Sequence, residues 1–267
     1  MSRPREALSD AVAVVLSVAR LADEHDIKYP AAALAYYGFV SVLPLLVVVL
    51  AVVGDTAAGA VYAGTPQLLA PEPRRLVAES LRTATGRTGA SVLALVAFSW
   101  CGVNVAADFL TVVGRVEGAP RRPRTERVRD ALAVLSSLAV AVALVVLTGG
   151  VFAQLPADSS LLLGWPVALV VALVVAFLPL YYVPSRVVSS LSAALPGALT
   201  AAAGWTLLIS IVRVYADTAA QYALYGVLSG LIVALTSFYL AAAALMLGVV
   251  VNAMYADGAT LLPARFR

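Results

Sequence analysis

The sequence predicts an all-α integral membrane protein with six transmembrane helices, and three observations support this fold class. Of the 267 residues, 62% are hydrophobic and only 12% are charged, whereas an ordinary soluble domain carries roughly 25% charged residues. The mean hydropathy is +0.94. The apolar residues gather in six runs, each close to the roughly 20 residues that a helix needs to cross a bilayer. This composition excludes a typical soluble domain and a disordered chain.

The six apolar runs are rich in Ala, Val and Leu and lack the two-residue alternation of a membrane β-strand. We therefore expect helices, which satisfy their backbone hydrogen bonds internally. The runs lie at about 31–53, 91–113, 131–153, 165–183, 194–214 and 227–251. They define one predicted transmembrane domain, residues 31–252, between an N-terminal segment (1–30) and a C-terminal tail (253–267).

Two shorter helices are predicted outside the spans. Residues 5–22 carry apolar side chains on one helical face, which favours either an amphipathic helix at the membrane surface or a helix that packs against the bundle. These apolar positions are Leu8, Val12, Val15, Leu16 and Ala19. In the long first loop, the polar stretch 74–87 follows three prolines and predicts a short external helix.

The distribution of Lys and Arg predicts the orientation of the chain. Thirteen of the 18 basic residues fall in the segments that would share a side with both termini, and five fall on the other side. The strongest cluster is the loop between the second and third runs, where Arg121, Arg122 and Arg124 are expected to contact anionic lipid headgroups. Both termini are therefore predicted to be cytoplasmic, in a multi-pass protein of the cell (inner) membrane.

Asp108 is the clearest candidate for function within the spans, because an ionisable group in a membrane is costly unless it is paired or hydrated. Asn104 and Trp100 precede it by one and two turns and share its helix face. Asp108 and Asn104 are predicted to line a cavity, where they would contact a cation, a proton or a polar headgroup. The alternative is an interfacial aspartate that pairs with an arginine such as Arg115 or reaches water.

Arg213 ends the fifth run on the opposite side of the membrane. One interpretation is that its side chain extends to the outer headgroups. The other is an anion or lipid-phosphate contact at an outer mouth, together with Tyr222.

Further candidates lie in the first run. Pro44 removes a backbone donor from the middle of this helix, and Ser41 is close enough to bond locally. Broken helices in transporters often expose backbone to a substrate, although proline kinks in membrane helices are also purely structural. Tyr36 and Tyr37 suit the membrane interface, and since they point in different directions one of them is expected to face the interior.

Gly226 and Gly230 form a G-x-x-x-G pattern at the start of the last run. Such spacing lets helices approach closely, so we expect helix packing here, within one chain or in a homo-oligomer.

Several segments resemble the YihY/BrkB family of inner-membrane proteins. The first run contains ALAYYGFVSVLPLL (33–46), and the fifth contains ALPGA (194–198) with Trp205 further along. Tyr222, Tyr225-Gly226 and Gly230, and then Tyr239, Leu247-Gly248 and Asn252, resemble the end of the family pattern. The resemblance implies six membrane helices, a proposed transporter role without a settled substrate, and Asn252 as a further site candidate.

The chain departs from the family pattern at two positions. Val250 stands where the family commonly has an acid, and Ser237 stands where it commonly has a tryptophan. A transport mechanism that depends on that acid would not carry over.

The expected function is that of an ATP-independent, transporter-like membrane protein for a small or amphipathic solute, and the alternative is a non-transporting scaffold that organises envelope lipids or partner proteins. The sequence has no P-loop and no G-x-G-x-x-G motif, and its single histidine and single cysteine build neither a catalytic triad nor a metal cluster. We therefore expect no enzymatic activity, no cofactor, no metal and no nucleic-acid partner. The expected partners are membrane lipids and an unknown solute.

Overall fold

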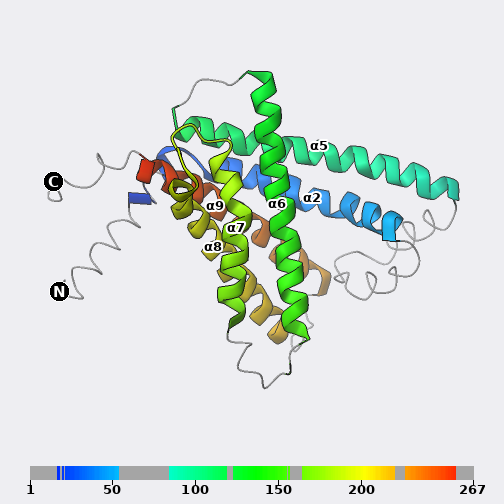
Figure 1. Cartoon of the computed structure of the whole chain (residues 1–267). Helices are drawn as coiled ribbons and strands as arrows, with labels where there is room; N and C mark the ends of the chain where they lie inside the picture. Colours follow the sequence, from blue (N-terminus) through cyan, green and yellow to red (C-terminus); the bar gives the residue numbers. More distant parts are fainter. Residues whose placement is uncertain are drawn as a thin grey trace, which may run out of the picture.

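A computed structural model describes residues 17–18, 20, 22–53, 84–118, 123–154, 156, 164–219 and 226–256, and regular secondary structure within them is entirely helical. The long helices correspond to the six apolar runs (Figure 1). They are α2 (Lys28–Val53), α5 (Ala84–Val116), α6 (Arg124–Ala153), α7 (Trp165–Tyr182), α8 (Leu191–Ala219) and α9 (Gly226–Ala256).

Five of these helices are long and apolar enough to cross a membrane within the described residues. They are Val92–Val116, Arg124–Ala153, Trp165–Tyr182, Leu191–Tyr215 and Gly230–Ala256. The sixth predicted span coincides with α2, whose crossing stays a prediction. Most of the predicted amphipathic helix 5–22 and of the predicted external helix 74–87 lies outside the described residues. Residues 84–87 form the first turn of α5.

The six helices pack in a closed order. α2 packs on α5 and α9, α8 packs between α9 and α7, and α6 completes the circuit between α7 and α5. α2 and α5 run side by side and cross α6 and α7 at a large angle, with α9 between the two groups (Figure 1). Helices that are adjacent in the chain are therefore not always the partners that pack most closely.

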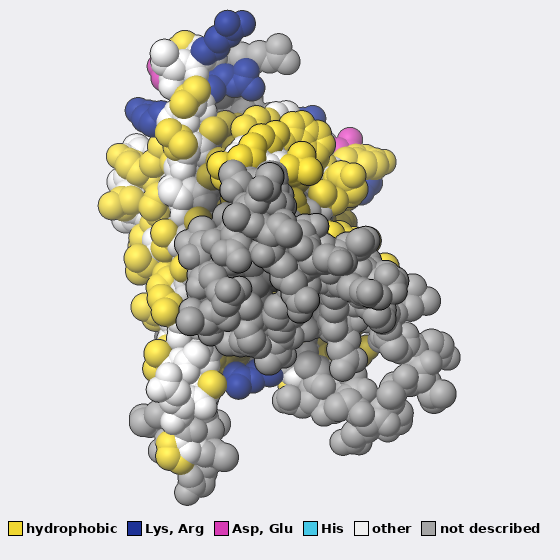
Figure 2. All heavy atoms as spheres, turned by 90° about the vertical axis from the view of Figure 1, so that its right-hand side faces the viewer, with side chains coloured by type: hydrophobic (Ala, Val, Ile, Leu, Met, Phe, Trp, Pro, Cys, Tyr) yellow, Lys and Arg dark blue, Asp and Glu magenta, His cyan; other side chains and the backbone are white. Residues whose placement is uncertain are grey.

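Basic side chains gather at one end of this bundle. They come from the start of α2, the end of α5, the start of α6 and the turn after α7, at Lys28, Arg115, Arg124, Arg129 and Arg186. Figure 2 shows most of the visible Lys and Arg side chains at one end of the molecule, with hydrophobic side chains along the flank. We call the end with these five residues the basic end, and the end where α7 begins the opposite end.

Burial is concentrated toward the basic end. Most buried side chains of α2, α6, α8 and α9 lie in the half of each helix nearer that end, and those described fall within 31–35, 130–141, 194–206 and 242–253. In the other halves the large apolar side chains are exposed, among them Val42, Leu93, Val146, Ile211 and Ile232. α7 is buried at intervals along its whole length, and α5 also has a buried side chain in the half nearer the opposite end, at Ala94. The helices thus converge at the basic end and diverge toward the opposite end, where apolar surface is compatible with lipid.

The chain enters α2 through a helix stop. The N–H of Asp26 bonds to the Asp23 carbonyl at 3.0 Å and the N–H of Ile27 bonds to the Ala22 carbonyl at 3.2 Å, which is the Schellman pattern. Asp26 takes the left-handed conformation, with φ of 51°, which Asp tolerates better than most residues. Ala22 and Ile27 are both buried. This turn sets the direction of α2 relative to the helical residues that precede it.

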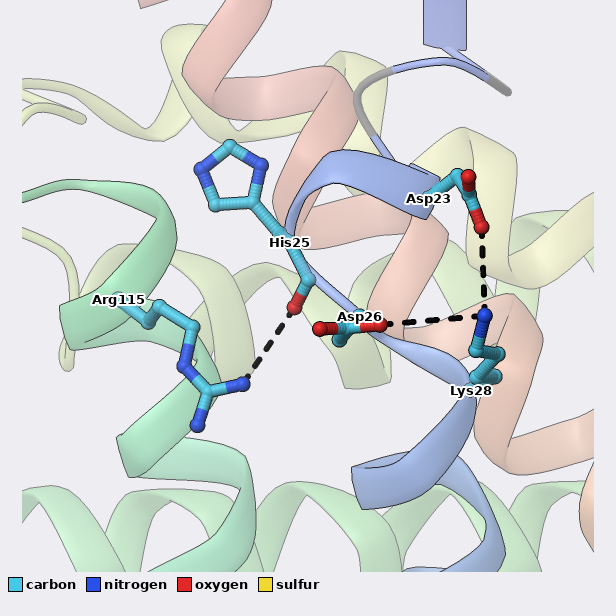
Figure 3. A network of polar contacts seen from close by, with 5 residues as sticks. All are labelled: Asp23, His25, Asp26, Lys28 and Arg115. Carbon is cyan, nitrogen blue, oxygen red and sulfur yellow. Dashed lines mark hydrogen bonds and ion pairs between the residues drawn. The ribbon is translucent and has the colours of Figure 1, made fainter.

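Lys28 closes the same turn by ion pairs with two acids. Its Nζ lies 3.4 Å from Asp23 Oδ1 and 3.8 Å from Asp26 Oδ1 (Figure 3). The hydrogen bond and the charge of Asp23 raise the pKa of Lys28 above its ordinary value. All three side chains are exposed, so these pairs orient the turn and add little to its stability.

Candidate functional site

The sequence candidates of α2 and α5 lie along the contact between these two helices. The rings of Tyr37 and Trp100 meet edge to face, 5.5 Å apart, and nearer the basic end Arg115 donates to the main-chain carbonyl of His25 at 3.4 Å (Figure 3). Asn104 and Asp108 lie on α5 between these two contacts. Both are half-buried and lie in the half of α5 nearer the basic end, along the seam between α2 and α5 that these two contacts define.

Asn104 and Asp108 differ in how their polar atoms are used. The Asn104 amide donates to the Trp100 carbonyl one turn earlier, at 2.7 Å. Asp108 is half-buried and has no hydrogen bond or ion pair with any described residue. The pairing with Arg115 that the sequence suggested is not formed, because Arg115 bonds to the carbonyl of His25 instead. Asn104 therefore has a hydrogen-bond partner, whereas the carboxylate of Asp108 bonds to none of the described residues.

The remaining candidates of α2 make local contacts. Tyr36 is exposed and its ring meets that of Tyr37 at 5.5 Å, so Tyr37 is the one that faces a neighbouring helix. Ser41 donates to the Gly38 carbonyl at 2.7 Å. Pro44 lies inside α2 as predicted, and Ser41 does not bond to the carbonyl of Val40, which Pro44 leaves without its usual donor.

Two aromatic side chains donate to the backbone of α9. The Tyr181 hydroxyl bonds to the Leu245 carbonyl at 2.9 Å, and the Trp205 indole bonds to the Ala241 carbonyl at 3.0 Å. The two carbonyls are one turn apart, so α7 and α8 are fastened to the same face of α9. Tyr181 is 3% exposed and belongs to the core.

Asn252 joins α9 to α8. Its Oδ1 accepts from the Gly197 N–H at 2.6 Å, and its Nδ2 donates to the Ala194 carbonyl at 3.4 Å. Gly197 follows Pro196, which has no N–H of its own, so the amide bonds to backbone where the hydrogen-bond ladder of α8 is interrupted. With its side chain 3% exposed, Asn252 lies within the packed core.

The close approach of α8 and α9 depends on two glycines. A Cβ at Gly248 would lie 2.6 Å from Cζ of Tyr181 and 2.7 Å from the carbonyl oxygen of Gly197. A Cβ at Gly197 would lie 2.5 Å from the side-chain carbon Cγ of Asn252. Because such distances are shorter than van der Waals contact, the small residues of ALPGA and of Leu247-Gly248 are required for this packing.

At the opposite end, Arg213 and Trp165 come together. The guanidinium carbon of Arg213 lies 5.3 Å from the centroid of the Trp165 ring, within the range of a cation–π interaction. Trp165 is 8% exposed, and its buried indole N–H has no hydrogen-bond partner among the described residues. The sequence placed each residue at this end, but only the fold joins the end of α8 to the start of α7.

The turn between α7 and α8 is anchored to the end of α5. Glu117 accepts hydrogen bonds from the Ser185 hydroxyl and from the N–H of Arg186, the latter at 2.9 Å. Ser185 Oγ in turn accepts from the N–H groups of Val187 and Val188 at 3.2 and 3.0 Å. Sequence reasoning missed Glu117, although an acid near the C-terminus of a helix is unfavourable for the helix dipole and so indicates another partner.

Asp130 is the second polar residue that sequence reasoning missed. It is 1% exposed, and its carboxylate lies 3.4 Å from the guanidinium of Arg129. The predicted third span began one residue later, which left Asp130 in the loop. The signal was present in the spacing, because Asp130, Val134, Ser137 and Ala141 form the buried face of α6.

The other sequence candidates give less information. Tyr222, Arg121 and Arg122 lie outside the described residues. Arg124 is exposed at the first residue of α6, Gly226 begins α9, and Gly230 is half-buried. In the described part of the chain, no three His, Cys, Asp or Glu side chains come together as a metal site would require.

A protein-family model described as "Virulence factor BrkB" matches residues 18–264, which include all six helices. The chain belongs to the BrkB family. This match confirms the resemblance carried by the first, fifth and sixth apolar runs. No curated protein and no solved structure matches the chain significantly.

The two positions at which this BrkB-family chain departs from the family pattern differ in burial. Val250, where the resemblance predicts an acid, is completely buried in α9, while Ser237 is half-buried. This BrkB-family chain therefore has an apolar residue in the core at the position of that acid.

Proposed function

We propose that this BrkB-family membrane protein is an ATP-independent, transporter-like protein for a small or amphipathic solute. The observation that carries the proposal is the uneven packing of the bundle, which is dense at the basic end and divergent at the opposite end. Alternating access requires a path that is closed on one side while it is accessible from the other. Both termini would lie on the cytoplasmic side of the cell (inner) membrane, as the arginine distribution predicts.

The residues of the closed half support a gate. Tyr181, Trp205 and Asn252 fasten α7 and α8 to α9, and Glu117 holds the α7–α8 turn against α5. Such a layer would have to loosen when a solute passes. Asp108 lies at the edge of this layer and, having no described partner, would contact the polar group of the solute.

Transport is tested with purified protein in liposomes, against a broad panel of metabolites and lipids. We expect movement of at least one solute, slowed in Asp108→Asn and unchanged in Glu126→Gln, which alters an exposed acid in the first turn of α6. Absence of movement for the whole panel would contradict the proposal.

Water access to the seam is tested separately by thiol labelling on a Cys101→Ala background. Cysteine at positions 104 and 108 should react with a polar maleimide, whereas cysteine at position 112, where Val112 is 2% exposed, should not. Equal protection at all three positions would favour the alternative function described next.

The second candidate is a scaffold that organises envelope lipids or partner proteins without moving a solute. It is favoured by the close packing of α7, α8 and α9, where Gly197, Gly248 and Asn252 leave no space for a solute. A scaffold would show neither solute movement in liposomes nor labelling at positions 104 and 108.

A further inference from the structure

The α7–α8 hairpin carries an unsatisfied group of hydrogen-bond donors at the opposite end. The guanidinium of Arg213 lies over the ring of Trp165 and forms no ion pair with the described residues. Its guanidinium has five N–H donors, and none of them is used by a described acceptor. Among the described side chains of this end, Arg213 is the one cation.

A second, independent feature points to a missing acceptor at the same place. The indole N–H of Trp165 is buried and has no partner in the described part of the chain, although a buried indole N–H usually finds one. An orphaned buried donor costs free energy comparable to its lost hydration. The guanidinium of Arg213 rests on the ring of Trp165, so the guanidinium and the indole that carries this N–H are neighbours.

The start of α7 adds a third positive element. α7 begins at Trp165 with Pro166 in its first turn, and Gly164 at the N-cap offers no side-chain cap. The first N–H groups of a helix lack intrahelical partners, although Pro166 removes one of them here, and the macrodipole makes this end positive. A guanidinium, an indole N–H and a helix N-terminus together favour an anion with several acceptor oxygens.

We propose that Arg213, Trp165 and the start of α7 bind the phosphate group of an amphiphile, with its acyl chain along the α7–α8 flank. An apolar chain is favoured over a free ion because exposed apolar stripes run away from this location along both helices. They consist of Val167, Val171 and Val175 on α7 and Leu207, Ile211 and Val214 on α8. If the protein is a transporter, this site names a phosphate-bearing amphiphile as its class of solute. Only this identification of the solute rests on the proposed function.

Binding is tested by the fluorescence of Trp165 itself, in vesicles of phosphatidylcholine that contain a minor fraction of brominated phosphatidylglycerol or brominated phosphatidylcholine. A Trp100→Phe background removes the exposed tryptophan of α5, and Trp165→Phe in that background gives the signal of Trp205 alone for subtraction. We expect Trp165 to prefer brominated phosphatidylglycerol about fivefold, the equivalent of about 1 kcal/mol for one basic residue at an anionic membrane surface.

The variants separate a built site from general attraction to the membrane. Arg213→Gln should abolish the preference and Arg213→Lys should retain most of it. Arg186→Gln is the matched control, because Arg186 is exposed at the basic end and its contact with Glu117 uses the backbone N–H. Equal quenching by the two brominated lipids in the unmodified protein, or a preference that survives Arg213→Gln, would overturn the proposal.

A final arm distinguishes the sources of the phosphate. Inorganic phosphate, added at constant ionic strength, should leave the quenching by brominated phosphatidylglycerol unchanged if the lipid is the preferred ligand. Relief of quenching would support the phosphate site but assign it to a soluble phosphate. Solute movement in liposomes without any Trp165 preference would overturn this site and leave transport standing, whereas the preference without movement would support the site and count against transport.

Discussion

Two asparagines of the membrane-spanning helices show how differently one side chain is used. The Asn104 amide returns its hydrogen bond to its own helix at Trp100. The Asn252 amide bonds to the backbone of a neighbouring helix at Gly197 and Ala194. Loss of an amide that bonds within its own helix leaves the packing between helices unchanged. Loss of an amide that bonds to a second helix disturbs that packing.

We therefore expect Asn252→Leu to lower the free energy of unfolding by about 1–3 kcal/mol, since it leaves a buried N–H and a buried carbonyl without partners. Asn104→Leu is the matched control and should change stability little. Both are measured by unfolding in detergent, followed by circular dichroism. Equal losses in the two variants would show that Asn252 contributes only its volume.

Gly248 gives a second prediction at this scale. Gly248→Ala would place a methyl group against the Tyr181 ring and the Gly197 carbonyl, so we expect a loss of about 1–3 kcal/mol from overpacking. Gly150→Ala adds the same group where, apart from its own helix backbone, no atom lies within 4 Å, and it should be neutral or slightly stabilising because alanine favours a helix. Thermal unfolding of the two variants in one detergent makes the comparison, and an unchanged Gly248→Ala would contradict the packing described here.

At the scale of elements, short polar contacts determine how the helices are connected at the basic end. Residues 183–190 form no regular element. Two of their hydrogen-bond donors nevertheless bond to the carboxylate of Glu117, at the end of α5. The contact joins segments 68 and 69 residues apart in the chain. A loop held in this way exchanges its amide hydrogens slowly even without helical hydrogen bonds.

Glu117→Ala should accelerate hydrogen exchange at the amides of Arg186, Val187 and Val188, because the first loses its acceptor and the other two depend on the placement of the Ser185 hydroxyl. Exchange in the middle of α7 should be unaffected. The measurement is hydrogen–deuterium exchange of the detergent-solubilised protein with peptide-level mass spectrometry. Glu126→Ala, at an exposed acid of α6, is the control, and identical exchange in the two variants would contradict the anchoring role.

At the scale of the whole molecule, the arrangement combines a closed end and an open end. The small residues of α8 and α9 allow dense packing where the helices converge, and elsewhere large apolar side chains are left for lipid. In a bilayer such exposure has little cost, because lipid tails are as apolar as the side chains themselves. In water, the same chain would have to bury this apolar surface.

The number of crossings is tested by single-cysteine labelling from one side of the membrane on a Cys101→Ala background. Asp23→Cys, Arg186→Cys and Tyr255→Cys should react with an impermeant maleimide from the same side, because each lies at the basic end. Gly164→Cys and Arg74→Cys should react only from the other side. If Asp23→Cys reacted from the side of Arg74→Cys, opposite to Arg186→Cys, α2 would not cross the membrane and five spans would remain.

Much of the fold follows from the sequence because helix positions in a membrane are decided locally. A run of about 20 apolar residues satisfies its own backbone hydrogen bonds and buries its side chains in lipid. The runs 165–183 and 131–153 accordingly became α7, which ends one residue earlier, and α6, which begins seven residues earlier. The family also follows from local motifs, since ALAYYGFVSVLPLL and ALPGA lie within single helices.

The tertiary structure decided which faces of those helices meet. In an apolar helix every side has similar hydrophobicity, so the sequence did not distinguish the buried Tyr181 from the exposed Tyr182. It likewise did not join Asn252 to Gly197, 55 residues earlier, or Arg213 to Trp165. The length and polarity of single helices are enough to show that a chain is a membrane protein. The contacts named here depend on how two helices are rotated and crossed, and close packing between the helices determines both.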